Sequence, residues 1–538
     1  MKLFNCYKIL LLLLLIISQF ILSQNKSSQI NDRKILSIIQ KADRSEFRYI
    51  PKKPGHYTAQ DWRKVIDSTW GEGLPTAKKL QIFDRFWNDI DAKYPSFFNI
   101  DVNWDSLKSV YRPEVEAGVS RGRFAAIMCK MNFVLSDIHS FIIDLPIATD
   151  SLKSGTPIFV TSGRQSSIDN EFLYREYCHF GATLSPLPDS SLLVIDVIPE
   201  HPLGLAIGDI VLGYDGIPWH SLITEIFNAD LPLYFIGTVG NSKKAKEFQL
   251  LTSAGENWHL FDTIDVIKKN GETIHLPTNL MQNKKMKLLS TYQLNVSGVE
   301  FPSFDNRKYV SWGVIDGTNI GYIYIWNWTH NGDFPYPTSS TGQEFKKAIN
   351  TLISTYNISS LIIDSRYNTG GWTDEIPIGL NVLFNENKDI FRAYYRNLPN
   401  DQYSMKPFEW APQYDLSLEP NRYLFDKPIA LLISPLSESC GDMMPFLMRY
   451  HPMVKTFGLG TCGAFGITAD DANVSDISGD WMYHRTLTDL KITNDPTRYL
   501  NHLNFTADEE VWFTEENVAK GEDDVAAFFI ENWLPAAS

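Results

Sequence analysis

Two short segments of the sequence carry residue types that could perform nucleophilic chemistry. Ser439 lies between an apolar strand and a predicted helix, and Gly370 and Gly371 follow another apolar strand. A serine hydroxyl attacks once a base removes its proton, and the reaction also needs N–H donors for the oxyanion that develops. The N–H of Cys440, with that of Gly370 or Gly371, could supply these donors. Together these residues suggest a serine hydrolase.

Each of these polar residues also has a structural interpretation. A serine at the start of a helix is more often an N-cap than a nucleophile. Asp442 fits a favourable charge near a helix N-terminus. Asp364 and Arg366, at the end of the strand before the glycine pair, are expected to brace the turn. The case for chemistry therefore depends on the wider organisation of the chain.

An alternation of strands and helices surrounds Ser439 and the glycine pair. Between residues 305 and 535 it predicts a mainly parallel sheet covered by helices. We expect strands at 320–326, 361–363, 428–433 and 453–457, and helices at 345–356 and 442–450. Pro445 fits the last helix only if it lies in the first turn. Both motifs then lie past the carboxyl ends of strands, where open α/β sheets hold ligands.

The chain before residue 300 is expected to hold two further domains, so that the fold class is multidomain α/β. Residues 76–150 predict a helical cap domain, because their apolar residues follow helical spacing. One of its helices ends just before His139, which places that histidine at a helix-to-strand junction. Residues 175–285 predict a β-rich domain with a hairpin at Asn270-Gly271, in which the stretch 220–262 is irregular. Residues 24–75 form an N-terminal extension.

Length, charge and the N-terminus limit the functions that are possible. The chain has 538 residues, too many for one ordinary core, and its net charge of −14 argues against binding nucleic acid. Residues 1–23 predict a signal peptide and therefore export, after which no stable membrane insertion is expected. A membrane anchor is the alternative, but the continuous apolar run is about half the roughly 20 residues that a span needs.

The cysteine pattern implies neither a metal nor a cofactor. The sequence has five cysteines and contains no CxxC and no His-Cys cluster. Cys440 and Cys462 both fall in the suspected site region. In an exported protein they could form a bridge, or they could remain two buried thiols.

Several motifs, spread over most of the chain, resemble those of the carboxyl-terminal processing (tail-specific) serine proteases. The matching segments are 194–216 (the PDZ domain), 361–371 (Ile-Asp-x-Arg-x-Asn-x-Gly-Gly), 429–442 (a strand and a Ser-Ala-Ser motif), 457–463 (Gly-x-x-Thr-x-Gly) and 505–533 (the tail, with Asp508 before a strand). In this resemblance Ser439 occupies the nucleophile position. The resemblance implies a ClpP/crotonase-like catalytic core over 300–538 and a PDZ-like domain over 175–285.

The resemblance also bears on the identity of the base. Many members of the family pair the serine with a lysine, but the corresponding position is Ala464, and Lys455 lies upstream in a predicted strand. The tricorn-core branch uses a histidine from the N-terminal helical region, and the setting of His139 is similar. That branch orients the histidine with a glutamate, for which Asn501 or Asp495 is the nearest counterpart here.

The sequence therefore predicts an exported serine endopeptidase that acts on polypeptide substrates. Ser439 would be the nucleophile, His139 the general base and Asn501 a third member, while Cys440 and Gly370 or Gly371 would form the oxyanion hole. The PDZ-like domain would bind an extended segment or a free C-terminus. The alternative is a non-catalytic relative that binds peptides or apolar ligands, as the interphotoreceptor retinoid-binding protein does. The oligomeric state and the choice between periplasm and full secretion stay open.

Overall fold

The structure is a computed structural model of the 538-residue chain. It describes residues 57–144, 147, 180–229, 240–282, 284, 286, 296–302, 308–330, 340–386, 388–409, 417–418, 425–467, 475–476, 479–493 and 495–534. The predicted signal peptide and Cys178 lie outside the described residues. The chain divides into two compact units, Arg48–Leu187 with Ser191–Ser538 and Met1–Phe47 with Pro188–Ser190. All the elements below belong to the first unit.

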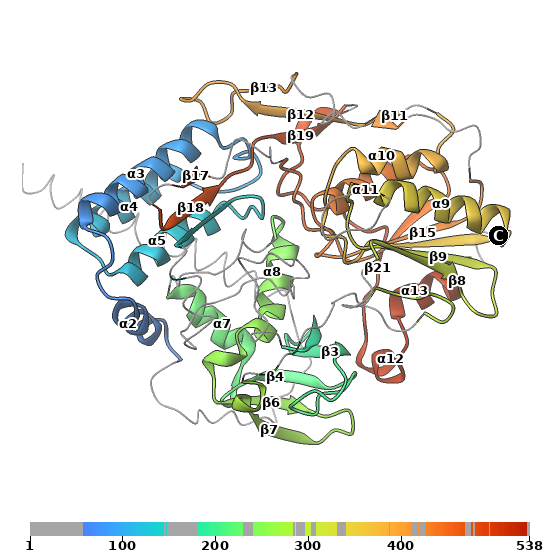
Figure 1. The fold of residues 1–538 in the computed structure, drawn as a ribbon, viewed down its shortest axis with the longest axis horizontal. Helices are drawn as coiled ribbons and strands as arrows, with labels where there is room; N and C mark the ends of the chain where they lie inside the picture. Colours follow the sequence, from blue (N-terminus) through green and yellow to red (C-terminus); the bar gives the residue numbers. More distant parts are fainter. Residues whose placement is uncertain are drawn as a thin grey trace, which may run out of the picture. The chain divides into compact units, whose positions relative to one another are not determined.

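A six-stranded sheet organises the part of the chain after residue 308 (Figure 1). Its strands are β8 (Val310–Val314), β9 (Ile320–Ile325), β10 (Ser360–Asp364), β15 (Ile429–Ile433), β16 (Val454–Gly458) and β21 (Glu509–Glu510). Their order is β21-β16-β15-β10-β9-β8, and all neighbours are parallel except β8 with β9. The predicted, mainly parallel sheet is confirmed. The strands that precede the glycine pair and Ser439 are the two central neighbours, β10 and β15.

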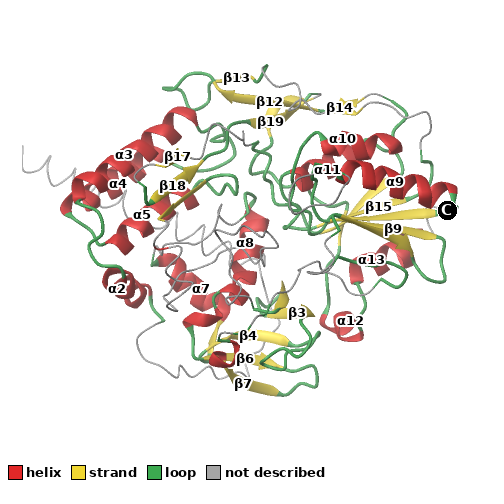
Figure 2. Cartoon of the chain, viewed as in Figure 1, coloured by secondary structure: helices red, strands yellow, loops and turns green. Residues whose placement is uncertain are grey.

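Helices cover both faces of this sheet (Figure 2). On one face, α9 (Thr341–Ser354), α10 (Glu375–Leu380), η4 (Asn381–Leu383) and α11 (Cys440–Met448) share a core with alternate residues of β10 and β15, Leu361 and Leu431 among them. On the other face, Phe457 of β16 contacts Phe529 and Trp533. The C-terminal helices there are α12 (Glu515–Lys520), α13 (Asp524–Phe528) and η6 (Phe529–Trp533). Burial on both faces explains why β9, β10 and β15 are largely apolar.

Helix α11 begins two residues earlier than the sequence predicts, at Cys440 instead of Asp442. The N–H groups of Asp442 and Met443 donate to the carbonyl of Ser439 at 2.9 and 3.0 Å, and the Asp442 carboxylate accepts the N–H of Ser439 at 2.9 Å. These bonds close the first turn on Ser439. Pro445 consequently lies in the second turn and not in the first, where we expected it.

The N-terminal helical region is confirmed as a set of helices followed by a strand. It contains α2 (Ala59–Thr69), α3 (Thr76–Lys93), α4 (Trp104–Ala117), α5 (Arg121–Phe133) and β1 (Phe141–Asp144). Strand β1 pairs with β18 (Trp481–His484), which also pairs with β17 (Ser475–Asp476). Trp481 and Tyr483 of β18 complete the apolar core of the helices. A late segment of the chain is therefore built into its N-terminal region.

Residues 180–282 form the expected β-rich part. Its sheet has the order β2-β3-β4-β6-β7, with β5 beside β4. The elements are β2 (Ala182–Pro186), β3 (Leu192–Val197), β4 (Ile210–Tyr214), β5 (Ile217–Pro218), α7 (Trp219–Asn228), α8 (Lys243–Thr252), η1 (Ser253–Glu256), η2 (Trp258–Leu260), β6 (Thr263–Ile267), β7 (Thr273–Pro277) and η3 (Thr278–Met281). The hairpin around Asn270-Gly271 is confirmed, since Ile267 pairs with Thr273.

The expectation that residues 220–262 are irregular is wrong, because this stretch contains most of α7 and all of α8. In α8 the residues from Glu247 to Thr252 are all buried, so no apolar stripe marks the helix in the sequence. The remaining strands form two small sheets, β13-β12-β19-β20 and β11-β14. They are β11 (Lys388–Asp389), β12 (Phe391–Arg396), β13 (Met405–Pro407), β14 (Ser417–Leu418), β19 (Asp489–Ile492) and β20 (Asp495–Tyr499).

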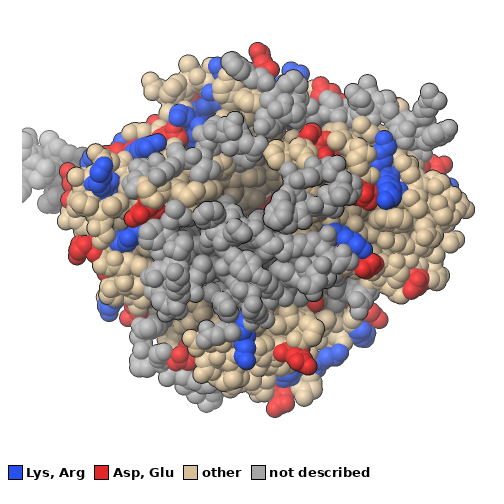
Figure 3. Space-filling model, viewed as in Figure 1, with Lys and Arg blue, Asp and Glu red and all other residues tan. Residues whose placement is uncertain are grey.

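The surface carries charges of both signs. Lysine and arginine side chains alternate with aspartate and glutamate on the face drawn in Figure 3. Within the described ranges, no helix combines the length and the apolar character that spanning a bilayer requires.

Candidate active site

Ser439 lies at a sharp turn between β15 and α11. The turn after β15 is held by serine side chains: the N–H of Ser434 donates to Ser437 Oγ at 3.0 Å, and Ser437 Oγ donates to the Ser365 carbonyl at 2.7 Å. At Ser439 the backbone has φ 54° and ψ −114°. A positive φ is uncommon for a residue other than glycine, and such strain is found at active sites. A strained strand-to-helix turn is also how many hydrolases present a nucleophilic serine.

Exposure distinguishes Ser439 from its neighbours. Every residue from Pro428 to Met448 is buried except Ser439. The strand, the turn and the helix thus enclose the whole segment but leave this one residue partly open to solvent. A serine that only capped a helix would have no need of this arrangement.

The glycine pair packs directly against Ser439. A Cβ atom on Gly370 would lie 2.6 Å from the Cβ of Ser439, and one on Gly371 would lie 2.0 Å from the carbonyl oxygen of Trp328. Both glycines have positive φ, 94° and 123°. Residue 370 must therefore be glycine for two reasons, its backbone conformation and the closeness of the serine.

Two backbone donors are suited to stabilise an oxyanion. The N–H of Gly370 donates to Asn368 Oδ1 at 3.0 Å, so this amide is already engaged. Among the described residues, the N–H groups of Gly371 and Cys440 donate to no acceptor. Cys440 is also the first residue of α11, where the helix dipole favours negative charge. Of the three amides that the sequence suggests, those of Gly371 and Cys440 fit the role best.

The Cys440 thiol is not a competing nucleophile. Its sulfur is fully buried and donates to the carbonyl of Gly371 at 3.1 Å. Burial raises the pKa of this thiol, although a hydrogen bond with Ser439 lowers it. The thiolate is the reactive form of cysteine, so a protonated, buried thiol is inert. Cys440 and Cys462 are buried thiols with no disulfide between them.

Asp442 ties Ser439 to the loop that follows β16. Its carboxylate accepts the N–H of Ser439 at 2.9 Å, of Gly463 at 2.6 Å and of Ala464 at 2.9 Å. Burial raises the pKa of Asp442 to about 7, although hydrogen bonds from Thr461, Gly463 and Ala464 lower it. Asp442 is thus more than a charge near a helix N-terminus, since it fixes the position of this loop beside the serine.

The lysine that many tail-specific proteases use has no counterpart at this loop. Ala464 is fully buried in a cluster with Ala245 and Cys462, against which Ile138 packs. Lys455 lies in β16, where its Nζ pairs with Glu509 at 2.6 Å.

His139 lies in a turn between α5 and β1. Its N–H donates to Asp137 Oδ1 at 2.9 Å, and the N–H of Ser140 donates to the Asp137 carbonyl at 3.0 Å. Ile138, the preceding residue, packs against the cluster of Ala245, Cys462 and Ala464. Because the N–H of Ala464 donates to Asp442, the turn that carries His139 meets the loop that Asp442 connects to Ser439.

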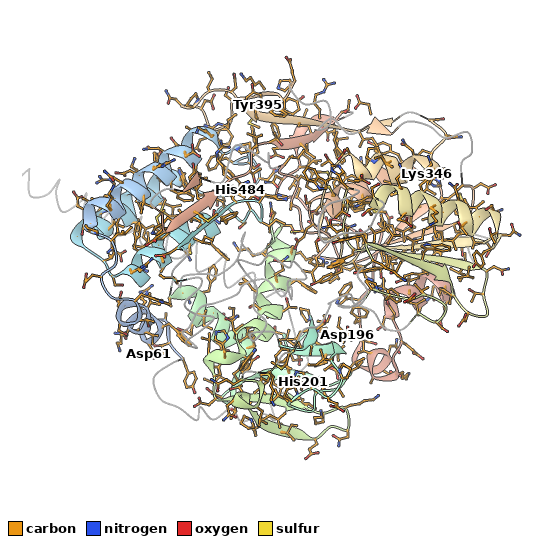
Figure 4. All side chains as sticks on the ribbon, viewed as in Figure 1. Asp61, Asp196, His201, Lys346, Tyr395 and His484 are labelled. Carbon is orange, nitrogen blue, oxygen red and sulfur yellow. The ribbon has the colours of Figure 1, made fainter. Side chains whose placement is uncertain are left out.

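A second histidine borders this turn. Nδ1–H of His484 donates to the carbonyl of His139 at 2.9 Å, and its ring stacks on Phe141. Figure 4 shows His484 on β18, the strand that pairs with β1. Burial lowers the pKa of His484, and Asp137 raises it.

The two candidates for a third catalytic residue differ in their surroundings. Asn501 is fully buried: its Oδ1 accepts the N–H groups of Phe465 at 2.9 Å and Gly466 at 3.1 Å, and its Nδ2 donates to Asp137 at 3.3 Å. Asp495 is exposed, and its carboxylate accepts a hydrogen bond from Thr497 at 2.6 Å. Asn501 therefore belongs to the group around His139, whereas Asp495 lies on the edge strand β20.

Sequence reasoning missed two residues of this group, Asp137 and Asn241. Asn241 Oδ1 accepts the N–H of Ile138 at 2.8 Å, and its Nδ2 donates to Asn501 at 2.9 Å. Asn241 lies in the stretch that we expected to be irregular, and nothing in its sequence context marks it. Asp137 is two residues before His139, which was the only signal available.

Asp364 and Arg366 brace the fold, as expected. The Arg366 guanidinium is buried and pairs with Asp364 at 2.7 Å and with Asp523 at 2.6 Å. Asp523 caps α13, so the pair connects the end of β10 to the C-terminal helices. This arrangement holds the segment 364–371 in place behind the glycine pair.

Comparisons with known proteins bear on the class of protein. Residues 319–480 match the model described as peptidase family S41, and residues 75–132 match the model described as the tricorn protease C1 domain. No curated protein matches the chain. The solved structure of mature CPAF is similar, with 14% identity, a TM-score of 0.58 and coverage of 83% of this chain and 94% of that chain. The structure of mature CPAF complexed with lactacystin is also similar, with 13% identity, a TM-score of 0.57 and coverage of 83% of this chain and 96% of that chain. At these identities the structural likeness shows the fold alone.

The fold and the two matches define the class of protein. The chain contains a segment, residues 319–480, that matches peptidase family S41, and the match of its helical region is consistent with the tricorn-core branch. It is a serine-type peptidase.

Replacing Gly370 with alanine should test the packing of the glycine against Ser439. The new Cβ would lie 2.6 Å from Ser439 Cβ, and a φ of 94° is strained for alanine. We expect labelling of Ser439 by a fluorophosphonate probe to slow by about 100-fold or more, because small displacements of reacting groups have large effects. The free energy of unfolding should fall by about 1–3 kcal/mol.

Gly317→Ala is the matched control. Gly317 also has a positive φ, 75°, but no atom lies within 4 Å of its added Cβ. This variant should lose similar stability in denaturant unfolding while keeping the labelling rate. Equal loss of labelling in both variants would show that strain alone, and not the contact with Ser439, is responsible.

Proposed function

We propose that this chain is an exported serine endopeptidase that cleaves polypeptide substrates through an acyl-enzyme on Ser439. The observation that carries the proposal is the setting of Ser439, the one residue from Pro428 to Met448 that is not buried, at a strained turn against Gly370. His139 is the proposed general base. A neutral imidazole is a suitable base near neutral pH.

In the proposed reaction, Ser439 Oγ attacks the carbonyl carbon of the scissile peptide bond while its proton passes to the imidazole of His139. The negative charge moves to the carbonyl oxygen, which accepts hydrogen bonds from the N–H groups of Gly371 and Cys440. The imidazolium then protonates the leaving nitrogen, the C–N bond breaks, and an ester to Ser439 remains. Water, deprotonated by His139, hydrolyses this ester and restores the serine.

Substrate binding is proposed to involve the PDZ-like part of the chain, residues 180–282. Among the described strands, β2 pairs only with β3 and lies at one side of the sheet. An extended peptide can add to such an edge by backbone hydrogen bonds. Export is proposed from the predicted signal peptide at residues 1–23.

The proposal can be tested by covalent labelling. Purified protein is treated with a fluorophosphonate probe, digested, and analysed by mass spectrometry. We expect a single adduct on the peptide that contains Ser439, and we expect the treated protein to stop cleaving an unstructured polypeptide. A protein that takes no label and cleaves no such polypeptide would contradict the proposal.

A further inference from the structure

A buried carboxylate, Asp137, lies at the centre of the polar group around the His139 turn. Its side chain is fully buried, and it accepts hydrogen bonds from several parts of the chain. The side-chain donors to its two oxygens are Tyr94 Oη at 2.8 Å, Thr486 Oγ1 at 2.7 Å, Asn501 Nδ2 at 3.3 Å and Asn241 Nδ2 at 3.5 Å. A buried charge needs this many partners, so the carboxylate is held in one orientation.

This carboxylate faces the proposed base. Asp137 Oδ1 accepts the N–H of His139 at 2.9 Å and lies 4.0 Å from Nδ1 of its imidazole. The His139 side chain is 17% exposed, whereas that of Asp137 is completely enclosed. A negative charge at this distance favours the protonated imidazole, which is the form that a general base reaches in the transition state.

Asn501 acts on Asp137 instead of on the imidazole. Its Nδ2 donates to Asp137, while its Oδ1 is occupied by the N–H groups of Phe465 and Gly466 and by Nδ2 of Asn241. With both ends of the amide engaged, Asn501 connects the carboxylate to the loop beside Ser439. It carries no charge that could stabilise an imidazolium.

The other charged and titratable groups near the turn do not duplicate the charge of Asp137. They are His484 on β18, Arg485 after it, Asp489 on β19, His502, Tyr94 at the end of α3 and Lys246 on α8. Burial lowers the pKa of both His484 and His502, although the charge of Asp137 raises it. Burial also raises the pKa of Asp489 to about 7, and its Oδ1 accepts the N–H of Asn501.

Burial disfavours the ionised form of Asp137, but His139, His502 and the hydrogen bonds from Thr486 and Tyr94 together hold its pKa below the ordinary value. Asp137 is therefore charged over the range in which a histidine base works. Lys246, whose Nζ donates to Ser136 Oγ at 2.9 Å, adds a positive charge near the same turn. The negative charge of Asp137 lies 4.0 Å from the imidazole of His139.

We propose that Asp137 is the positioning residue for His139. Asn501 in turn holds the carboxylate of Asp137 through the hydrogen bond that its Nδ2 donates. The inference rests on the proposed function above, because it assumes that His139 is the base. The resemblance suggests that an acid near residue 501 orients the histidine. In this proposal the orienting acid lies instead on the same turn as the histidine. Both groups then move together if the helical region moves relative to the sheet.

Asp137→Asn is the direct test, with the pH dependence of probe labelling and of kcat/KM as readouts. Loss of the charge should make the imidazole easier to deprotonate, so the acid limb of both profiles should shift to lower pH by about 1 unit. The plateau values of the labelling rate and of kcat/KM should fall by about 10- to 100-fold. That loss is smaller than the roughly 10⁴-fold that follows when a directly hydrogen-bonded triad aspartate is replaced, because 4.0 Å separates the two groups.

Asp489→Asn is the matched control, since it removes another fully buried carboxylate from the same group. In the Asp489→Asn variant, the acid limb of both pH profiles should stay at the wild-type pH. If Asp137→Asn does not fold, the exchanged pair Asp137→Asn with Asn501→Asp keeps one carboxylate and one amide in the group. The double variant should fold. Its acid limb should still lie at lower pH than that of the wild type, because position 137 no longer carries a charge.

The outcomes separate this inference from the proposed function. A wild-type protein that takes no label on Ser439 would contradict the proposed function itself. If the wild type is labelled but the acid limb of folded Asp137→Asn, or of the exchanged pair, stays at the wild-type pH, Asp137 is not the positioning residue. An equal shift in Asp489→Asn would likewise overturn the inference, because the loss of another buried carboxyl group would then have the same effect.

Discussion

Replacing Ser439 with alanine is expected to abolish turnover and fluorophosphonate labelling while leaving the fold intact. Removal of a catalytic serine lowers kcat by about 10⁶-fold in a well-studied protease, and we expect a loss of that order here. The backbone at Ser439 is held by its N–H bond to Asp442 and by the N–H groups of Asp442 and Met443 that donate to its carbonyl, and these three bonds do not involve the hydroxyl. Thermal unfolding of Ser439→Ala should therefore stay within about 1 kcal/mol of the wild type. The measurements are steady-state cleavage of an unstructured polypeptide and in-gel detection of the probe.

Ser437→Ala provides the control for Ser439→Ala. Ser437 lies two residues earlier in the same turn, and its hydroxyl joins the Ser365 carbonyl to the N–H of Ser434. Its loss removes the acceptor of the buried Ser434 N–H and leaves the Ser365 carbonyl with the N–H of Asn368, which should cost about 1–3 kcal/mol of stability. Labelling at Ser439 should remain. A Ser439→Ala protein that still takes the label would contradict the assignment and point to another nucleophile.

Replacing His139 with glutamine is expected to give the second largest loss. Glutamine keeps a polar side chain of similar length but cannot accept a proton from the serine. General-base catalysis contributes about 10²- to 10⁴-fold, so kcat/KM and the labelling rate should both fall by this factor. The acid limb of the pH profile should disappear, because the titrating base is gone. Stopped-time labelling across a pH series measures both effects.

His484→Gln tests the competing assignment. His484 donates to the carbonyl of His139 from β18, so it is another imidazole in direct contact with this turn. If it only supports the turn, its replacement should lower the labelling rate by less than about tenfold and leave the acid limb in place. Full activity in His139→Gln together with a large loss in His484→Gln would assign the base to His484.

Much of the fold was predictable because its strands and helices have local signatures. The strands β9, β10 and β15 are short, largely apolar runs, and helix α9 has apolar residues on the face that packs in the core. These patterns depend on burial on one or both sides of an element, which leaves a periodic trace in the sequence. Helix α8 escaped detection for the opposite reason, because most of its residues are buried all round.

The start of α11 shows where local reasoning falls short. The sequence predicted a helix from Asp442, as Asp often lies in a first turn. In the structure Asp442 is the third residue of the helix, and its carboxylate also accepts the N–H groups of Gly463 and Ala464. Those bonds come from a loop about 20 residues later in the chain. No local pattern around Asp442 contains them.

The sequence by itself determined the class of fold, the two strand ends that meet, and Ser439 as the residue to examine. Those features depend on short segments whose spacing reflects a turn, a strand or a helix. Only the tertiary structure decided which groups surround the His139 turn, since Asp137 and Asn501 are 364 positions apart and yet share a hydrogen bond. Contacts over such separations depend on how whole elements pack, and pairs of this kind leave no periodic signal in a single sequence. For the same reason, the partial exposure of Ser439 and the choice of Gly371 and Cys440 as donors became visible only in the folded chain.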